Sequence, residues 1–284
     1  MTRRVPWLEQ LLTSEVTNRI RNDERTLAKP GTLLGWPRDT IFSQVINGGQ
    51  ADFDRPIGHL SGDDRALLYA DFNQRRHLDE LSHAFRQLVD NRSLPAGLTI
   101  LDLGCGPFTA GLSFAEVVGN VVPFRYFGVD RSSAMRRLGQ TLASGARMSG
   151  GLHELTSIWF GDRLVNADFG RVRGEPTIVV VSYLLASPTL DIQILIDELE
   201  AALNRIGCGM AAVLYTNSAM ALATQKYPAF KAALMERGFQ EEVDCMERFT
   251  DTDKEPKQLH YALFVRPATT TIRIREGQVC DSQN

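Results

Sequence analysis

The sequence predicts an α/β protein: a doubly wound sheet of seven strands that ends in an antiparallel hairpin and carries a helical cap at its N-terminus. Short apolar segments alternate with helical segments along the middle of the chain, which is typical of a parallel sheet. Two further strand-like segments near the end have no helix between them, which indicates a hairpin. Ahead of the first strand, helical spacing dominates.

The N-terminal part is predicted to form two helices around an irregular segment. Residues 7–29 place apolar side chains at helical spacing until a Pro-Gly pair ends the pattern. Residues 30–62 carry many glycines and prolines between scattered aromatic side chains, and we expect them to fold over a pocket. Ser61-Gly62-Asp63-Asp64 resembles a helix start, and a long amphipathic helix then runs to about Asn91. Residues 1–92 are therefore predicted to form a cap or lid.

The α/β segment starts after a Pro-Ala-Gly break at residues 95–97. We predict strands near 98–103, 124–129, 157–161, 177–184 and 209–215, and helices near 109–118, 132–147, 190–205 and 219–237. Strand-like residues 239–249 and 259–265 are joined by a polar loop and form the predicted hairpin. We expect one domain over residues 93–267 and a loosely held polar tail over 268–284.

Composition narrows the class of protein. A chain of 284 residues with 43% hydrophobic content can bury one large α/β core and still carry an appendage. The net charge of -3 gives no overall attraction to nucleic acid, so RNA binding is disfavoured. The four cysteines include no Cys-x-x-Cys pair, which favours neither a zinc site nor a disulfide framework. The absence of a signal peptide and of an apolar run of about 20 residues predicts a soluble cytoplasmic protein without a membrane span.

The most informative segment is Asp102-Leu103-Gly104-Cys105-Gly106, which follows an apolar strand and precedes small residues that can open a helix. Such a strand, tight loop and helix form a cradle for a nucleotide. Asp130 stands at the end of the next predicted strand, where a carboxylate can accept both hydroxyl protons of a ribose.

Three features favour a methyl-donor pocket over a dinucleotide pocket. Asp102 lies inside the strand end, where it can reach toward a positively charged amine. The third glycine of the dinucleotide fingerprint is missing. The terminal hairpin adds a reversed edge strand. From about Leu98 to Val265, the chain resembles the class I S-adenosylmethionine-dependent methyltransferases.

The resemblance implies a Rossmann-like methyltransferase sheet, the cofactor S-adenosyl-L-methionine and a set of cofactor residues. The Asp102-x-Gly104-x-Gly106 loop holds the methionine part, Asp130 holds the ribose, and Asp162 meets the adenine, with Asp168 as its competitor. We also place Cys105, Arg131 and Ser182 in this set. Other interpretations remain: Asp102 or Asp130 caps a helix, and Cys105 is a small packing residue.

Phe108 stands where the family has its third glycine. A bulky ring there can reshape the loop, and it supports an alternative in which the pocket has lost catalytic power and the protein is a non-catalytic nucleotide-binding partner. A second alternative is an rRNA or ribosome-associated methyltransferase. The chain partly resembles methyltransferase-like proteins of the mitochondrial small ribosomal subunit, but its dispersed cysteines do not supply their iron-sulfur spacing.

Missing motifs restrict the acceptor. The predicted fourth strand ends in Ser182-Tyr183-Leu184-Leu185 and not in the Asn/Asp-Pro-Pro-aromatic motif of enzymes that methylate the exocyclic amines of bases. No Pro-Cys pair provides the nucleophile for methylation of a pyrimidine carbon. Carboxylates suited to a metal are also absent from this strand end, so we predict no metal.

Tyr183 and His77 are the catalytic candidates. Tyr183 is expected at the carboxyl end of a strand beside the methyl group. Tyr69, Asn73, Arg76 and His77 recur at spacings of three and four, which places them along one side of a helix that faces either the pocket or solvent. His77 is the candidate proton acceptor. We therefore predict methyl transfer to a small-molecule acceptor, with the oligomeric state undetermined.

Overall fold

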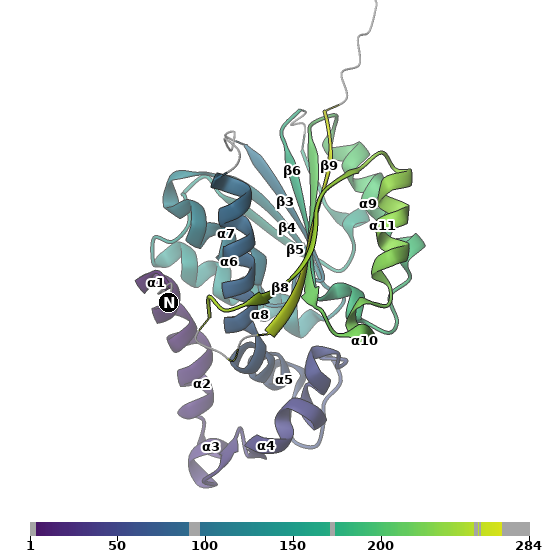
Figure 1. The fold of residues 1–284 in the computed structure, drawn as a ribbon. Coiled ribbons are helices and arrows are strands. Elements are labelled where there is room, and N and C mark those ends of the chain that lie inside the picture. The colour runs from purple at the N-terminus through teal and green to yellow at the C-terminus, as the bar shows by residue number, and fades with distance from the viewer. Residues whose placement is uncertain (1–3, 91–96, 171–173, 253–254, 256, 269–284) are drawn as a thin grey trace, which may run out of the picture.

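The computed structural model describes residues 4–90, 97–170, 174–252, 255 and 257–268. A seven-stranded sheet forms the centre of the molecule, with helices on both faces (Figure 1). Its strands are β3 (Leu98–Leu103), β4 (Phe124–Val129), β5 (Ser157–Gly161), β6 (Thr177–Ser182), β7 (Ala211–Ser218), β8 (Gln240–Phe249) and β9 (Lys257–Arg266).

The strand order is β5-β4-β3-β6-β7-β9-β8. Strands β3 to β7 pair in parallel, whereas β9 runs antiparallel to β7 and pairs with β8 as a hairpin. The predicted doubly wound sheet with a reversed terminal hairpin is therefore confirmed. The chain leaves β3 toward β4 on one side and returns to β6 on the other, so a crevice opens at the carboxyl ends of β3 and β6.

Two helical layers cover the sheet. The first contains α6 (Arg75–Asp90), α7 (Thr109–Val118) and α8 (Ser133–Met148), and the second contains α9 (Ile192–Ile206), α10 (Ala221–Thr224) and α11 (Tyr227–Glu236) (Figure 1). The single helix predicted over 219–237 is divided into α10 and α11. Pro228, the second residue of α11, has no N–H to donate to the carbonyl of Thr224, which interrupts the helix at this point.

The cap is built from short helices and turns. They are α1 (Pro6–Leu12), α2 (Asn18–Arg21), α3 (Glu24–Ala28), α4 (Arg38–Thr40) and α5 (Gly62–Tyr69), with the two-residue strands β1 (Thr32–Leu33) and β2 (Trp36–Pro37). The helix predicted over 7–29 breaks before α3, because the Asp23 side chain accepts the Arg25 N–H and starts a new helix. Ser61 and Asp64 form the capping box of α5, and a π-helical turn joins α5 to α6. The segment 91–96 and the predicted tail beyond residue 268 lie outside the described residues.

The cap shares its core with the sheet. Leu8, Leu12 and Phe85 of the cap belong to the same buried apolar cluster as Phe114 and Tyr126 of the α/β part. A second cluster lies between the other face of the sheet and helices α9 and α11. The division at residue 92 stays a prediction, but the cap is packed as one layer of the α/β core.

A lid loop, residues 47–54, extends from the cap over the sheet crevice. Buried Arg65 of α5 holds both flanks of this loop, since its guanidinium donates to the carbonyls of Val45, Asp52 and Arg55. Hydrogen bonds from a charged donor to three carbonyls fix the loop more firmly than apolar packing alone.

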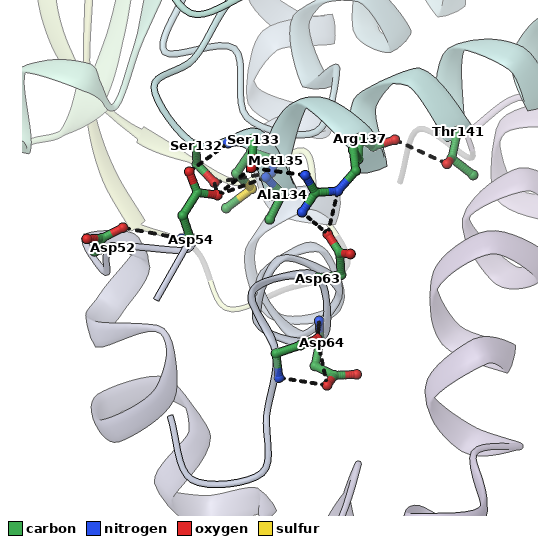
Figure 2. A network of polar contacts seen from close by, with 11 residues as sticks. Asp52, Asp54, Asp63, Asp64, Ser132, Ser133, Ala134, Met135, Arg137 and Thr141 are labelled. Atoms are coloured by element: carbon green, nitrogen blue, oxygen red, sulfur yellow. Dashed lines mark hydrogen bonds and ion pairs between the residues drawn. The ribbon is translucent and has the colours of Figure 1, made fainter. Parts of the chain in front are cut away.

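Asp54, at the end of the lid loop, caps helix α8 (Figure 2). Its carboxylate accepts the backbone N–H groups of Ser133 and Ala134 at 2.9 and 3.0 Å and the hydroxyls of Ser132 and Ser133, each at 3.0 Å. Burial alone would raise the pKa of Asp54. The hydrogen bonds to its carboxylate have the larger effect and lower the pKa to about 2. The carboxylate therefore ties the lid loop to the helix that follows β4.

We expect Asp54→Ala to lower the free energy of unfolding by about 0.5–2 kcal/mol, the range for loss of a helix cap, and to increase hydrogen exchange in residues 47–54. Urea denaturation and exchange mass spectrometry measure the two effects. Asp39→Ala, at an exposed carboxylate of the same cap, is the matched control and should change neither.

The hydrogen bonds to the Asp54 carboxylate also predict that the stability of the protein depends on pH in acid. Because folding lowers the pKa of Asp54 from 3.8 to about 2, its stabilisation is complete above pH 3.8 and disappears as the pH falls through 2. The stability difference between the wild type and Asp54→Asn should therefore shrink over this interval in urea titrations. A difference that stays constant down to pH 2 contradicts the assignment.

Candidate functional site

A cavity of about 620 Å³ lies at the carboxyl ends of β3, β4 and β6, beneath the lid loop. One wall consists of loop residues that follow these strands, and the opposite wall comes from the lid loop and helix α6. Five of the eight residues predicted to bind the cofactor line it: Gly104, Gly106, Asp130, Arg131 and Ser182. The two catalytic candidates, His77 and Tyr183, line it as well.

The loop after β3 requires its two glycines. Gly104 and Gly106 have φ of 71° and 50°, in the left-handed region that glycine adopts without strain. The N–H groups of Gly104 and Cys105 both donate to the carbonyl of Val129, which pulls the loop against the end of β4. A Cβ on Gly104 would lie 2.9 Å from Leu184, whereas the nearest atom to a Cβ on Gly106 is 4.0 Å away, on Tyr69. Gly106 therefore leaves room for a ligand beside the backbone.

Phe108 takes the left-handed conformation, with φ of 68° and ψ of 27°, directly before helix α7. Its ring is fully buried, packs edge-on against Tyr126 with centroids 4.7 Å apart, and lies outside the cavity lining. Gly111 accommodates the ring, since a Cβ there would lie 1.9 Å from it. The aromatic side chain thus replaces the expected glycine without filling the nucleotide site.

Asp130 joins the glycine loop to helix α8. Its Oδ2 accepts the Gly106 N–H at 3.0 Å and its Oδ1 accepts the Ser132 N–H at 2.8 Å. Burial raises the pKa of this carboxyl above its ordinary value, against the opposing effect of these two hydrogen bonds. Each oxygen keeps a lone pair for a further donor, which is what recognition of a ribose diol requires.

Asp102, Cys105 and Asp162 do not line the cavity. Asp102 is buried, and its Oδ2 accepts a 2.6 Å hydrogen bond from the Tyr126 hydroxyl; burial raises the pKa of Asp102 to about 7. Cys105 is also buried, and burial raises the pKa of its thiol, as expected for a packing residue. Asp162 is exposed and accepts a hydrogen bond from Asn166. In this arrangement Asp102 supports the loop from beneath.

His77 of α6 and Tyr183, which directly follows β6, stack on each other and join the two walls of the cavity. Their ring centroids are 4.0 Å apart with an interplanar angle of 21°, and the Tyr69 hydroxyl lies 3.4 Å from Nδ1 of His77. Burial, together with the charges of Arg76 and Lys257, lowers the pKa of His77 to about 3, so its imidazole is neutral at pH 7. Tyr183 occupies a left-handed conformation with φ of 57°, which directs the chain sharply after β6.

The sequence analysis missed three side chains near the cavity. Glu80, on α6 one turn beyond His77, is buried, and neither carboxylate oxygen has a hydrogen-bond partner within 3.5 Å. Burial raises the pKa of Glu80 to about 8, opposed mainly by its proximity to the Tyr183 hydroxyl. Lys257 lines the cavity from the start of β9, and Asp54 closes the lid loop. The polar stripe of α6 signalled Glu80, whereas Lys257 and Asp54 depend on contacts between distant segments.

Two further searches covered the described part of the chain. Among those residues, no three His, Cys, Asp or Glu side chains gather closely enough to hold a metal ion. None of their helices is both long and apolar enough to cross a bilayer.

No family model and no curated protein sequence matches this chain. Solved structures do match. Magnesium protoporphyrin IX methyltransferase from Synechocystis PCC 6803, with bound S-adenosylmethionine, is 14% identical and covers 86% of this chain and 97% of its own, with a TM-score of 0.45. A putative class I S-adenosylmethionine-dependent methyltransferase from Listeria monocytogenes is 12% identical over 75% of this chain and 68% of its own, with a TM-score of 0.48.

A putative RNA methyltransferase from Pyrococcus horikoshii is also 12% identical, over 68% of this chain and 85% of its own, with a TM-score of 0.39. Because these similarities are low, the fold assignment rests on the strand order. The parallel strands β5-β4-β3-β6-β7 with the reversed β9-β8 hairpin form the class I methyltransferase fold.

We expect Phe108→Ala to lower the free energy of unfolding by about 3–5 kcal/mol, because a fully buried ring is removed. Phe108→Gly should be the less harmful change, since glycine relieves about 1 kcal/mol of left-handed strain. Urea denaturation of both variants tests this order. Phe42→Ala, at a half-exposed ring of the cap, is the control, and a loss below about 1 kcal/mol in Phe108→Ala contradicts the packing role.

Proposed function

We propose that this protein binds S-adenosylmethionine in the sheet crevice and transfers its methyl group to a small molecule held beneath the lid loop. The observation that supports this most directly is the meeting of the two walls in one cavity. Gly106, Asp130 and Tyr183 come from the sheet side, and His77 comes from α6 and stacks on Tyr183. The volume of about 620 Å³ lies within the range of cofactor and small-ligand sites.

The residues present fit the methyl donor. Gly106 offers open space beside its backbone, and Asp130 presents a carboxylate for the ribose. Leu164, Leu184 and Leu195 supply apolar surface for a flat base. The bound donor supplies a sulfonium methyl group, which a nucleophile of the acceptor displaces in line. We keep Asp102 as a residue that supports the loop, and Arg131 and Ser182 as further contacts.

Catalysis by this chain would consist mainly of alignment. The stacked His77 and Tyr183 would hold the acceptor in place beside the donor, and the lid loop would cover one side of the cavity. The neutral imidazole of His77 has a nitrogen lone pair that can accept a proton. Its pKa of about 3, however, makes it a weak base in the ligand-free cavity. His77 can therefore take a proton only if binding of the methyl acceptor raises the pKa of the imidazole.

The alternative of a non-catalytic nucleotide-binding protein loses the support that Phe108 gave it, because the ring points into the core and does not enter the cavity. No contact described above specifically favours RNA as the acceptor. The lid loop lies over the cavity, which leaves less room for a large acceptor than for a small molecule. We therefore retain the small-molecule acceptor.

Asp130→Ala and Asp130→Asn should weaken binding of both S-adenosylmethionine and S-adenosylhomocysteine by about 10- to 100-fold, the range for loss of hydrogen bonds to a charged group. Isothermal titration calorimetry measures both affinities. Asp197→Asn, an exposed carboxylate on the outer side of α9, should leave them unchanged. Unchanged affinities in both Asp130 variants would falsify the ribose assignment, and a wild type that binds neither nucleoside contradicts the proposed function.

The class of acceptor needs a separate experiment. Protein incubated with radiolabelled S-adenosylmethionine and a fractionated cell extract should transfer label to the small-molecule fraction. A Tyr183→Ala, His77→Ala double variant, which removes the stacked wall, should lose most of this transfer while it retains affinity for S-adenosylhomocysteine. Label in RNA or protein instead overturns the small-molecule assignment.

A further inference from the structure

Two cations lie together at the acceptor end of the cavity. Arg76 of α6 and Lys257, the first residue of β9, both line it, and we call this pair the cationic corner. Burial lowers the pKa of Lys257, and the charge of Arg76 lowers it further, as expected for two like charges that line one cavity. Both charges also act on His77.

Within the described part of the chain, no carboxylate forms an ion pair with either member of the cationic corner. One terminal nitrogen of Arg76 makes a long 3.4 Å contact with the Glu255 carbonyl, and its buried Nε has no acceptor. The exposed Glu255 carboxylate has only a minor favourable effect on Lys257. Glu80 is the buried acid nearby and its charge favours the charged form of Lys257, but burial raises the pKa of Glu80 to about 8, so it compensates the pair only in part.

Two like charges in a partly enclosed cavity are unfavourable unless an anion compensates them. A guanidinium presents paired N–H donors that match the oxygens of a carboxylate or phosphate, and an ammonium adds a point charge. The His77–Tyr183 stack lines the same cavity, and aromatic rings pack favourably against a planar group.

We propose that the cationic corner binds the anionic group, a carboxylate or a phosphate, of a small acceptor whose planar part lies against the His77–Tyr183 stack. This inference rests on the proposed methyl transfer, and it adds the chemical class of the acceptor. The lid loop that covers the cavity favours a small anion over the backbone of an RNA.

The anion has a consequence for His77. The charges of Arg76 and Lys257 help to hold the pKa of this imidazole at about 3. A bound anion offsets both charges, so it raises the basicity of His77 only when the acceptor is in place. The acceptor thereby prepares the residue that is positioned to take its proton.

Binding of three matched probes to the protein saturated with S-adenosylhomocysteine tests the proposal. Benzoate and phenyl phosphate carry the anion in its two forms, and benzamide is the neutral isostere of benzoate. We expect at least one anion to bind about tenfold or more tightly than benzamide, as measured by calorimetry or ligand-observed NMR. Equal binding of anionic and neutral probes, or no binding of either anion, overturns the proposal.

Variants locate the effect. Arg76→Gln and Lys257→Gln should each remove most of the preference for the anion while the affinity for S-adenosylhomocysteine stays unchanged, and Arg76→Lys should retain part of it. Arg237→Gln, at an exposed arginine paired with Asp197, is the matched control and should behave as the wild type. A preference that survives in both glutamine variants contradicts the assignment to this corner.

The failure of the two proposals can be distinguished. If the wild type does not bind S-adenosylhomocysteine, the methyl-transfer function fails, and the same probes tested without nucleoside still report on the cationic corner. If the nucleoside binds and labelled product forms, anion-exchange chromatography of the product is decisive. Label in an anionic metabolite supports the inference, and phosphatase treatment distinguishes phosphate from carboxylate. Label in RNA or in a neutral metabolite overturns it.

Discussion

The geometry of the site depends on how one carboxylate, that of Asp130, divides its hydrogen bonds. One oxygen holds the Gly106 N–H and the other holds the Ser132 N–H, so the glycine loop and the start of α8 are fixed to the same side chain. Ser132 then donates its hydroxyl to Asp54 of the lid loop. A continuous set of bonds therefore connects the nucleotide side of the cavity to its cover, and no part of it can shift alone.

The same contacts supply hydrogen-bond acceptors for the backbone N–H groups at the N-terminus of α8. The backbone N–H groups of Ser133 and Ala134 go to Asp54, and that of Met135 goes to the Ser132 hydroxyl. Since all three donors are used within the protein, the helix end serves to position the lid loop. Opening of the lid has to break these bonds, which links access to the cavity with the order of the first turn of α8.

Local pattern predicted the sheet well. The bounds predicted for β3, β4 and β5 agree with the structure, because short apolar runs with nearby glycines define strands locally. The same reasoning found Gly104, Gly106 and Asp130, which lie at strand ends. It also predicted Asp102 as a cofactor contact, but this side chain does not line the cavity: it follows the pleat of Leu98 and Ile100 into the core and accepts the Tyr126 hydroxyl.

Local sequence pattern did not identify residues whose roles come from contacts between segments that are far apart in the sequence. Asp54 reaches α8 across nearly 80 positions of sequence, and Lys257 meets Arg76 only because the reversed hairpin ends beside α6. Pattern at the scale of one helix turn carries no information on these pairings. The conformation of Phe108 was equally hidden, because it requires the small Gly111 to leave space for the ring.

The electrostatics of the cavity connect these observations. Asp130 provides a carboxylate at one end, and Arg76 and Lys257 provide two cations at the other, with the uncharged His77 and Tyr183 between them. Charges act more strongly in such an enclosed space than in water. Under the proposed function, the carboxylate of Asp130 favours a positively charged donor, and the cationic corner favours an anionic group of the acceptor. Burial raises the pKa of Glu80 to about 8, so this acid offsets the two cations only in part.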